Sequence, residues 1–225
     1  MRNGHTMYET IIFDLDGTLL DTLDDLTDAV NAALDKCGLR PRTRDEVRAF
    51  VGNGIVKLME RAVGKGNEMC QEEALAEFKR YYALHCADKT APYEGILSLL
   101  KGLQAQGIKT AVVSNKVDFA VKSLAKTYFD GLLLAAVGEN EAEGIRKKPA
   151  PDSLLTVMEQ LSATAEKTVY VGDSEVDIQT AKNAGVACIC VTWGFRDKDF
   201  LLREGGQLFV DSPMELFDYT KGAGI

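Results

Sequence analysis

The chain has 225 residues, of which 46% are hydrophobic and 27% are charged, a balance typical of globular proteins rather than disordered or fibrous ones. Its net charge of −8 at pH 7 argues against a general affinity for nucleic acid or anionic membranes, although a local basic pocket could still bind a small anion. No apolar run approaches the ~20 residues that span a bilayer, and the polar residues 1–7 contain no signal-peptide core, so we expect no membrane partner.

The first expected strand covers residues 11–13 and leads into Asp14-Leu15-Asp16-Gly17-Thr18. Residues two apart in an extended chain face the same side, so Asp14 and Asp16 are expected to point together. Gly17 lets the backbone turn sharply where the strand ends. Asp-x-Asp alone is common in solvated turns. The apolar run before it and the Gly-Thr after it favour a pair of functional carboxylates.

Residues 22–89 interrupt the strand pattern, because they have helical periodicity and no strand-like run. Thr22 is expected to cap a helix that ends before Gly38. Thr43 and Glu46 have the spacing of a capping box for a second helix. Further helical segments are expected at residues 55–63 and 71–87. A helical block directly after the first strand predicts a separate cap domain.

The later strands alternate with helices, which is the pattern of a parallel α/β sheet. They are expected at residues 108–113, 132–137, 168–171 and 186–191. Ser114-Asn115 follows the first of them, and Gly172-Asp173 follows the third. Because ligands bind at the carboxyl ends of strands in open parallel sheets, these polar clusters mark the candidate site.

Asp173 and Asp177 form a second acidic pair, at a strand end and in the first turn of a helix. Carboxylates there can simply balance the helix dipole. If the two strands are neighbours, however, three or four carboxylates converge, and charges about 4 Å apart repel by roughly 4 kcal/mol at an effective dielectric of about 20. A bound cation removes that cost, and hard oxygen ligands favour Mg²⁺.

Cationic and polar groups that could bind phosphate accompany these carboxylates. Lys148 precedes a helix that Pro151 can start, and its ammonium beside a carboxylate–metal site would neutralise substrate phosphate. Ser114 and Asn115 stand where a strand stops, so their hydroxyl, amide and backbone N–H groups could hold phosphate oxygens. A solvated lysine and a chance Ser-Asn pair are the alternative interpretations.

The remaining side chains exclude several other chemistries. His5 and His85 are the only histidines, so Ser-His-Asp, Cys-His and multi-His zinc sites are not expected. The five cysteines lack metal-site spacing, and Cys188 and Cys190 would share one face of a strand as small buried thiols. Free thiols favour a reducing cytosol, and we therefore expect a cytoplasmic protein.

Together these pieces resemble the haloacid dehalogenase-like hydrolase superfamily in order and approximate spacing. The matching motifs are Asp14-Leu15-Asp16-Gly17-Thr18, Ser114-Asn115, Lys148-Pro149 and Gly172-Asp173-Ser174-Glu175-Val176-Asp177. The resemblance implies an α/β fold with a Rossmann-like, doubly wound parallel sheet and an inserted all-helical cap. On that basis we expect a catalytic core at residues 1–21 and 90–225 and a cap at residues 22–89.

The resemblance also implies a role for each motif residue. Asp14 would be the nucleophile that becomes an aspartyl-phosphate, and Asp16 would protonate the leaving group and then accept a proton from water. Ser114, Asn115 and Lys148 would bind the phosphoryl group. Mg²⁺ would be held by Asp14, the backbone carbonyl of Asp16 and Asp173, with Asp177 at or near the metal shell. Dehalogenases lack an acid at the position of Asp16, which favours phosphoryl transfer.

Residues 50–54 and 58–62 resemble the cap of phosphoglycolate phosphatases, and Ser114-Asn115-Lys116 is close to their Thr-Asn-Lys. Ser114 in place of Thr and the Glu-rich residues 138–146 depart from that pattern. We therefore expect a small phosphorylated metabolite as substrate, phosphoglycolate first, and a monomer or homodimer.

The alternatives within the superfamily are a β-phosphoglucomutase-like phosphomutase, a pyrophosphatase, and a sugar or nucleotide phosphatase. A response-regulator receiver domain would lack the helical block at residues 22–89. A non-catalytic binding or regulatory protein would be expected to lose the nucleophile, Asp16 or the metal ligands, and all of them are present.

Overall fold

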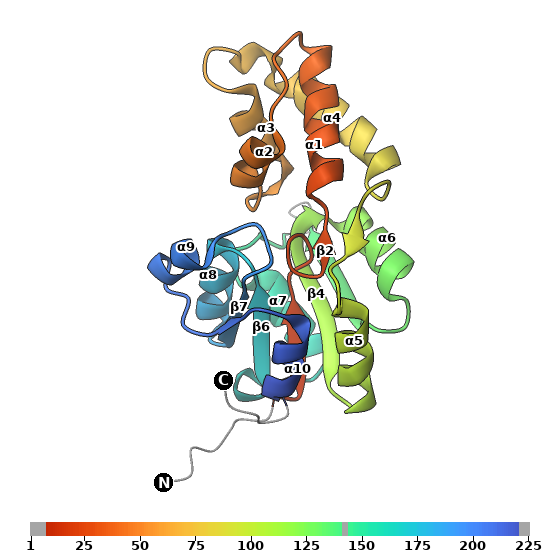
Figure 1. The fold of residues 1–225 in the computed structure, drawn as a ribbon, viewed down its shortest axis with the longest axis vertical. Coiled ribbons are helices and arrows are strands. Elements are labelled where there is room, and N and C mark those ends of the chain that lie inside the picture. The colour runs from red at the N-terminus through yellow and green to blue at the C-terminus, as the bar shows by residue number, and fades with distance from the viewer. Residues whose placement is uncertain (1–7, 141–143, 221–225) are drawn as a thin grey trace.

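The structure is a computed structural model that describes residues 8–140 and 144–220. Figure 1 shows a sheet covered by helices in the lower half of the molecule and a separate group of helices, α1–α4, above one edge of that sheet. We call this group the helical unit. Among the described residues, none of the helices combines the length and the apolar character needed to cross a bilayer.

The main sheet is parallel and, within the described residues, has the strand order β5-β4-β1-β6-β7-β8. Its strands are β1 (Thr10–Phe13), β4 (Lys109–Val117), β5 (Ala135–Glu139), β6 (Thr168–Gly172), β7 (Ala187–Val191) and β8 (Phe209–Val210). β1 lies between β4 and β6, so the chain segments that follow these three strands meet at one edge. This is the neighbour relation that the carboxylate cluster requires.

Helices cover both faces of the sheet. Strand residues point alternately to opposite sides, so apolar residues on each face pack against a different set of helices. Ile11 and Phe13 belong to one apolar cluster together with residues of α5, α6 and α10, whereas Ile12 belongs to another with α7 and α8. The helices of this core are α5 (Ile96–Ala105), α6 (Asp118–Phe129), α7 (Asp152–Gln160), α8 (Glu175–Ala184), α9 (Lys198–Arg203) and α10 (Pro213–Thr220). The doubly wound α/β fold expected from the sequence is therefore confirmed.

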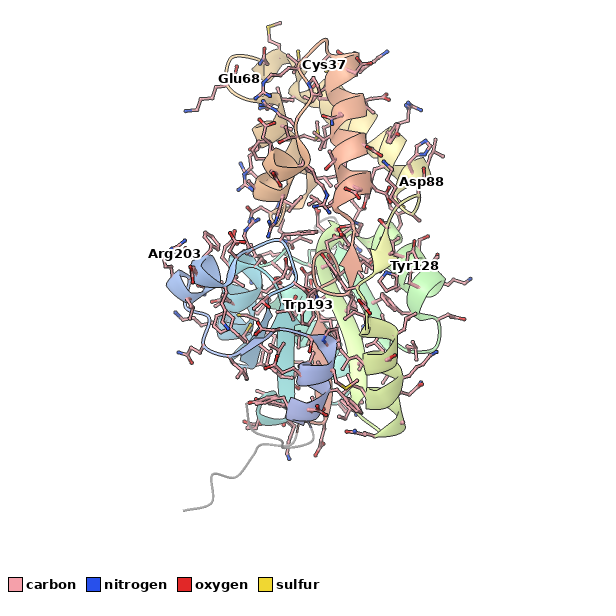
Figure 2. The ribbon with its side chains drawn as sticks, viewed as in Figure 1. Cys37, Glu68, Asp88, Tyr128, Trp193 and Arg203 are labelled. Atoms are coloured by element: carbon pink, nitrogen blue, oxygen red, sulfur yellow. The ribbon has the colours of Figure 1, made fainter. Side chains whose placement is uncertain are left out.

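The helical unit has an apolar cluster of its own, built largely from one face of each helix. Its elements are α1 (Leu23–Lys36), α2 (Arg44–Phe50), α3 (Gly54–Val63), the 3₁₀ turn η1 (Glu68–Cys70) and α4 (Gln71–His85). Cys37 and Glu68 lie at the end of the unit remote from the sheet (Figure 2).

The two helix caps expected in this region have different outcomes. The capping box of Thr43 and Glu46 is present at the start of α2. Thr22 precedes α1, but its hydroxyl makes no capping hydrogen bond, so this part of the expectation was wrong. The backbone N–H of Leu23 instead donates to Oδ1 of Asp21 over 3.2 Å.

Two chain crossings join the helical unit to the sheet. They pair as short antiparallel strands, β2 (Leu20–Asp21) and β3 (Ala91–Pro92). Beside them, the buried carboxylate of Asp25 accepts hydrogen bonds from the backbone N–H groups of Lys89 and Thr90 and from the Thr90 hydroxyl. Asp25 therefore ties the outgoing helix α1 to the returning chain.

Asp25→Ala should destabilise the protein by about 2–4 kcal/mol, because it leaves several buried donors without an acceptor. Chemical denaturation of the variant and the wild type measures this loss. Asp35→Ala, an exposed position on the same helix, is the matched control and should cost much less. An equal loss in both variants would contradict the role given to Asp25.

The strand boundaries differ most from the expected ones in β5 and β4. The strand expected at residues 132–137 is β5, which starts at Ala135, because residues 130–134 form the turn after α6. β4 extends beyond residue 113 to Val117 and so carries Ser114, Asn115 and Lys116 within the strand rather than after it. Its pairing with β5 shifts register between Val113 and Val117, the irregularity of a β-bulge.

Candidate active site

A cavity of about 590 Å³ lies between the carboxyl edge of the sheet and the helical unit, because residues of both line it. The residues expected at the site that line it are Asp14, Asp16, Ser114, Asn115, Lys148 and Asp173. Asp177 is fully buried behind this surface. Apolar residues of α3 and α4, including Ile55 and Phe78, form much of the opposite wall. The chain thus brings together residues from motifs more than 150 positions apart.

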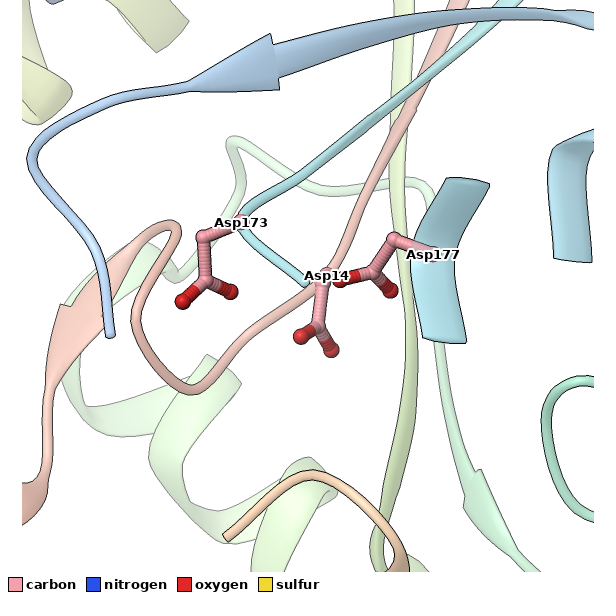
Figure 3. A group of neighbouring side chains, drawn as sticks. All are labelled: Asp14, Asp173 and Asp177. Carbon is pink, nitrogen blue, oxygen red and sulfur yellow. The ribbon is translucent and has the colours of Figure 1, made fainter. Parts of the chain in front are cut away.

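Three carboxylates meet at the base of the cavity. Asp14 follows β1, Asp173 follows β6, and Asp177 lies in the first turn of α8; Figure 3 shows their carboxyl groups around one shared space. One oxygen from each lies within 4.8 Å of the other two. Because β1 and β6 are neighbours in register, the strand ends themselves position Asp14 against Asp173.

Lys148 places its ammonium among these acids. Its Nζ lies 2.8 Å from Oδ1 of Asp14 and 2.7 Å from Oδ1 of Asp177, and it also donates to the hydroxyl of Tyr170 over 3.0 Å. The lysine side chain is only 3% exposed, so water does not screen these charges. One buried cation therefore faces three buried carboxylates, which leaves an excess of negative charge.

Burial raises the pKa of Asp14 to about 7; the charge of Lys148 opposes this shift and that of Asp177 adds to it. The pKa of Asp173 is also raised well above its usual value. Burial is the largest cause, and the charges of Asp177 and Asp14 raise the pKa further. In the metal-free protein these groups therefore resist being ionised together.

The arrangement fits a divalent cation. Oδ1 of Asp14 is buried and accepts no hydrogen bond from the described residues, although Lys148 lies within ion-pair distance of it. The three oxygens lie within 4.8 Å of one another. Two ligands on opposite sides of one Mg²⁺ are about 4.2 Å apart, since the typical Mg–O distance is about 2.1 Å, so one ion could contact these oxygens directly or through water. All the donors are hard carboxylate oxygens, the ligands that Mg²⁺ prefers.

Mg²⁺ affinity should increase with pH from roughly pH 6 to pH 8, because the ion must displace the proton that a carboxyl group of pKa about 7 retains below neutrality. The dissociation constant should fall by up to about tenfold per pH unit below pH 7 and level off above it. Isothermal titration in buffers of different ionisation enthalpy measures both the affinity and the protons released. A pH-independent affinity without proton release would contradict this prediction.

Asp177 is the least available of the three acids. Its Oδ1 accepts from Lys148 and, over 3.2 Å, from the hydroxyl of Tyr170. Its Oδ2 accepts from the hydroxyl and the backbone N–H of Ser174 at 2.6 and 3.1 Å, as part of the capping box of α8. Each oxygen thus accepts from two protein groups, and Asp177, unlike Asp14 and Asp173, does not line the cavity. Both observations favour a supporting place beside the metal rather than the innermost one.

Glycines make room for Asp173. A Cβ atom at Gly17 or at Gly194 would overlap the Asp173 side chain, and Gly17 also has a positive φ of 88°. The carboxylate is fixed between them, because Oδ1 accepts from the Thr18 hydroxyl and Oδ2 from the backbone N–H of Phe195 at 2.6 Å. Small residues thus allow two loops to close around one carboxylate.

Gly17→Ala should reduce Mg²⁺ affinity by at least about tenfold, because the added methyl group displaces a carboxylate of the candidate metal site. Gly107→Ala is the matched control: its φ of 73° is also positive, but a methyl group added there would have no neighbouring atom within 4 Å. Both substitutions should cost about 1 kcal/mol of stability through backbone strain. Only Gly17→Ala should weaken the binding of Mg²⁺. Equal affinities in the two variants would rule out the steric argument.

Asp16 faces the cavity but stands apart from the other acids. Its carboxylate pairs with Lys116 of β4, whose Nζ lies 2.8 Å from Oδ1 and 3.0 Å from Oδ2. Its side chain is therefore absent from the carboxylate group of Figure 3. That the backbone carbonyl of Asp16 binds the metal stays a prediction.

Ser114 and Asn115 differ in how free they are to bind a ligand. The Ser114 hydroxyl lines the cavity and accepts from the backbone N–H of Lys116 over 3.2 Å. The Asn115 side chain forms a reciprocal pair with the backbone of Lys148, accepting over 2.7 Å and donating over 3.0 Å, and it also donates to the carbonyl of Gly52. Asn115 therefore holds two loops together.

Sequence reasoning missed the contacts that join the helical unit to the core. Arg196, after β7, donates to the backbone carbonyls of Arg48 and Val51, while Arg48 donates to the carbonyls of Phe195 and Gly194. Phe195 packs into the apolar cluster of the helical unit. The only signal in the sequence is the pair Phe195-Arg196 a few residues after the strand expected at residues 186–191, and that does not identify its partners.

Comparison with known proteins gives a consistent result. The family model described as haloacid dehalogenase-like hydrolase matches residues 11–191. Phosphoglycolate phosphatase from Pseudomonas putida is 34% identical over 213 residues, which is 92% of this chain and 77% of that protein. Phosphoglycolate phosphatase from Aquifex aeolicus is 34% identical over 190 residues, with 82% and 85% covered.

Solved structures share the arrangement as well. A crystal structure from Lactobacillus delbrueckii subsp. bulgaricus, provisionally described as a phosphoglycolate phosphatase, superposes with a TM-score of 0.89 at 39% identity and covers 95% of this chain and 98% of that one. A predicted phosphoglycolate phosphatase from Haemophilus somnus gives 0.87 at 27% identity, with 96% and 100% covered.

Proposed function

The chain belongs to the haloacid dehalogenase-like hydrolases and is a phosphatase of that family, and from this premise we propose that it hydrolyses a small phosphate monoester through an aspartyl-phosphate on Asp14, with Mg²⁺. Phosphoglycolate is the first candidate substrate, because relatives at 34% identity carry that name. The observation that carries the proposal is the buried meeting of Asp14, Asp173 and Lys148 at the floor of one cavity.

In the first half-reaction an oxygen of Asp14 bonds to phosphorus while the bond between phosphorus and the leaving oxygen breaks. Lys148 and the Ser114 hydroxyl bind the equatorial phosphoryl oxygens, where negative charge is concentrated. Asp16 gives a proton to the departing alkoxide. The product is an acyl-phosphate on Asp14 and a free alcohol.

In the second half-reaction water attacks the same phosphorus from the side that the alcohol has left. Asp16, now a carboxylate, takes a proton from the water as the new bond forms. The bond between phosphorus and the Asp14 oxygen breaks, so phosphate is released and the Asp14 carboxylate is regenerated. Asp16 lies on the cavity wall near Asp14, as both steps require.

Asp14, Asp173 and the backbone carbonyl of Asp16 would hold the Mg²⁺, with Asp177 supporting them. When bound, the ion supplies positive charge that offsets the repulsion between the Asp14 carboxylate and the incoming phosphate. The helical unit would act as a cap that excludes water from the site, with residues 22–89 as the cap and the remainder as the catalytic core. Gly52 and Gly54 of the helical unit border the cavity, and the side chain of Asn115 donates to the carbonyl of Gly52.

The direct test is phosphate release from a panel of small phosphoesters, ranked by kcat/KM, with Mg²⁺ and with EDTA. The panel contains phosphoglycolate, glycerol phosphates, sugar phosphates, nucleotides and pyrophosphate. We expect Mg²⁺-dependent hydrolysis with phosphoglycolate in the leading group. Transfer of phosphate between sugar positions would point to a phosphomutase, and no release from any ester would reject the proposed hydrolysis.

A further inference from the structure

We propose that Lys116 is a positioning residue for Asp16, and that Tyr82 of the helical unit holds Lys116 in turn, so that the base of the second half-reaction is in place only while the helical unit covers the sheet edge. The inference rests on the proposed function, because it assigns how Asp16 is aligned to accept the proton of the attacking water. In that step the water oxygen bonds to phosphorus, the Asp14–phosphorus bond breaks, and one water proton passes to Asp16.

The contact between Lys116 and Asp16 is bidentate. Nζ of Lys116 donates to both carboxylate oxygens, at 2.8 and 3.0 Å. The Lys116 side chain is 4% exposed and that of Asp16 is 20% exposed, so only the acid retains access to the cavity. Two hydrogen bonds from one ammonium fix the plane of the carboxylate, which would otherwise rotate freely at the end of its side chain.

Tyr82 completes the surroundings of the ammonium. Nζ of Lys116 lies 4.8 Å from the centroid of the Tyr82 ring, within the range of a cation–π contact. An ammonium has three N–H groups, and the two directed at Asp16 leave one side that a polar ligand or an aromatic face can cover. The ring covers that side without competing for the carboxylate.

Tyr82 belongs to the helical unit and not to the core. It lies on α4, stacks on Phe78 with ring centroids 5.4 Å apart, and is part of the apolar cluster of the unit. Lys116 and Asp16 lie on β4 and after β1, both in the core. The chain Asp16–Lys116–Tyr82 therefore crosses from the core to the helical unit, and movement of α4 away from the sheet would remove its last member.

A purely structural role for this ion pair is less favoured by its energetics. Desolvating two charges offsets most of their attraction, so a buried ion pair adds little to stability in comparison with apolar residues of the same size. The pair instead fixes a side chain of the cavity wall. The backbone N–H of Lys116 also donates to the Ser114 hydroxyl, so the same residue aligns a phosphate-binding group.

The test is pre-steady-state release of p-nitrophenolate from p-nitrophenyl phosphate by the full chain with Mg²⁺. Because nitrophenolate leaves without a proton, the first half-reaction should barely depend on Asp16, whereas the second requires its carboxylate. Lys116→Met should therefore keep the rate of the initial burst within a few-fold and raise the ratio of burst rate to steady-state rate by about 10²-fold. Asp16→Asn should show the same pattern.

Graded variants separate positioning from folding. Lys116→Arg, which keeps a cation, should raise the ratio less than Lys116→Met, and Tyr82→Leu should raise it more than Tyr82→Phe, which keeps the ring. Lys101→Met, at an exposed lysine of α5, is the control and should leave the wild-type ratio unchanged. If Lys116→Met does not fold, Lys116→Arg and Tyr82→Leu still carry the test.

The outcomes distinguish this inference from the function on which it rests. An unchanged ratio in folded Lys116→Met and Tyr82→Leu, with both phases reduced equally, would overturn the positioning role while the hydrolase remains. Nitrophenolate release by the wild type that survives in Asp14→Asn would overturn both proposals together.

Discussion

Asp14→Asn should lower kcat at least ~10³-fold for every phosphoester that the wild type hydrolyses, because it removes the nucleophile and leaves an amide of nearly the same shape. The loss should appear in kcat rather than in KM, since the amide still occupies the same space beside Lys148. Phosphate release under saturating substrate measures the effect.

The control for this substitution is Asp45→Asn, at an exposed position in the first turn of α2. It removes one carboxylate from the chain without touching the cavity, so its turnover should equal that of the wild type. Near-normal turnover in a folded Asp14→Asn protein would mean that another group attacks phosphorus, and would reject the proposed mechanism.

Lys148→Met should lower the free energy of unfolding by about 3 kcal/mol in the metal-free protein at pH 8, because Asp14 and Asp177 lose the cation that neutralises them. It should also lower kcat/KM by about 10²–10³-fold, since the ammonium no longer stabilises the transferring phosphoryl group. Urea denaturation and steady-state kinetics measure the two effects.

The stability loss in Lys148→Met should depend on pH and on metal. The pKa of Asp14 is raised to about 7 even with Lys148 present, so below that pH protonation removes one of the unpaired charges. The loss should therefore be smaller at about pH 5 than at pH 8, and Mg²⁺ should restore part of it at pH 8. A loss equal to that of the exposed control Lys101→Met would show that Lys148 is not the counter-charge of this cluster.

Much of the fold was predictable, because short apolar runs ending in polar clusters identify strands of a parallel sheet. Residues 11–13 and 168–171 are strands as expected, and their neighbour relation brings Asp14 and Asp173 together. The helical block at residues 22–89 was visible because its apolar residues recur at helical spacing. The start of β5 was missed because an apolar sequence does not distinguish the turn at residues 130–134 from the strand that follows.

The candidate site was predictable only as a set of residue types. Motif order identified Asp14, Asp16, Ser114, Asn115, Lys148 and Asp173, all of which line the cavity. The clustering of Asp14 and Asp173 with Asp177 is the reason that a cation is expected. The roles assigned to them stay predictions until they are tested.

Contacts between distant side chains were not predictable from one sequence. Lys116 appeared beside a recognisable motif, but its pairing with Asp16 depends on how far β4 continues and how it lies against the chain after β1. The bonds of Arg196 to the helical unit likewise depend on where that unit sits above the sheet. Periodicity fixes the face on which a residue lies, not the distance to a partner 100 positions away.

The most direct measurement of the central proposal is the identification of the phosphorylated residue. Wild-type protein is mixed with substrate and Mg²⁺, quenched in acid during turnover, reduced with borohydride to convert an acyl-phosphate into a stable alcohol, and digested for mass spectrometry. We expect the peptide containing Asp14 to carry the reduced residue at position 14, and Asp14→Asn treated in the same way to carry none. Modification at any other residue, or turnover with no modified peptide at any quench time, would contradict the account.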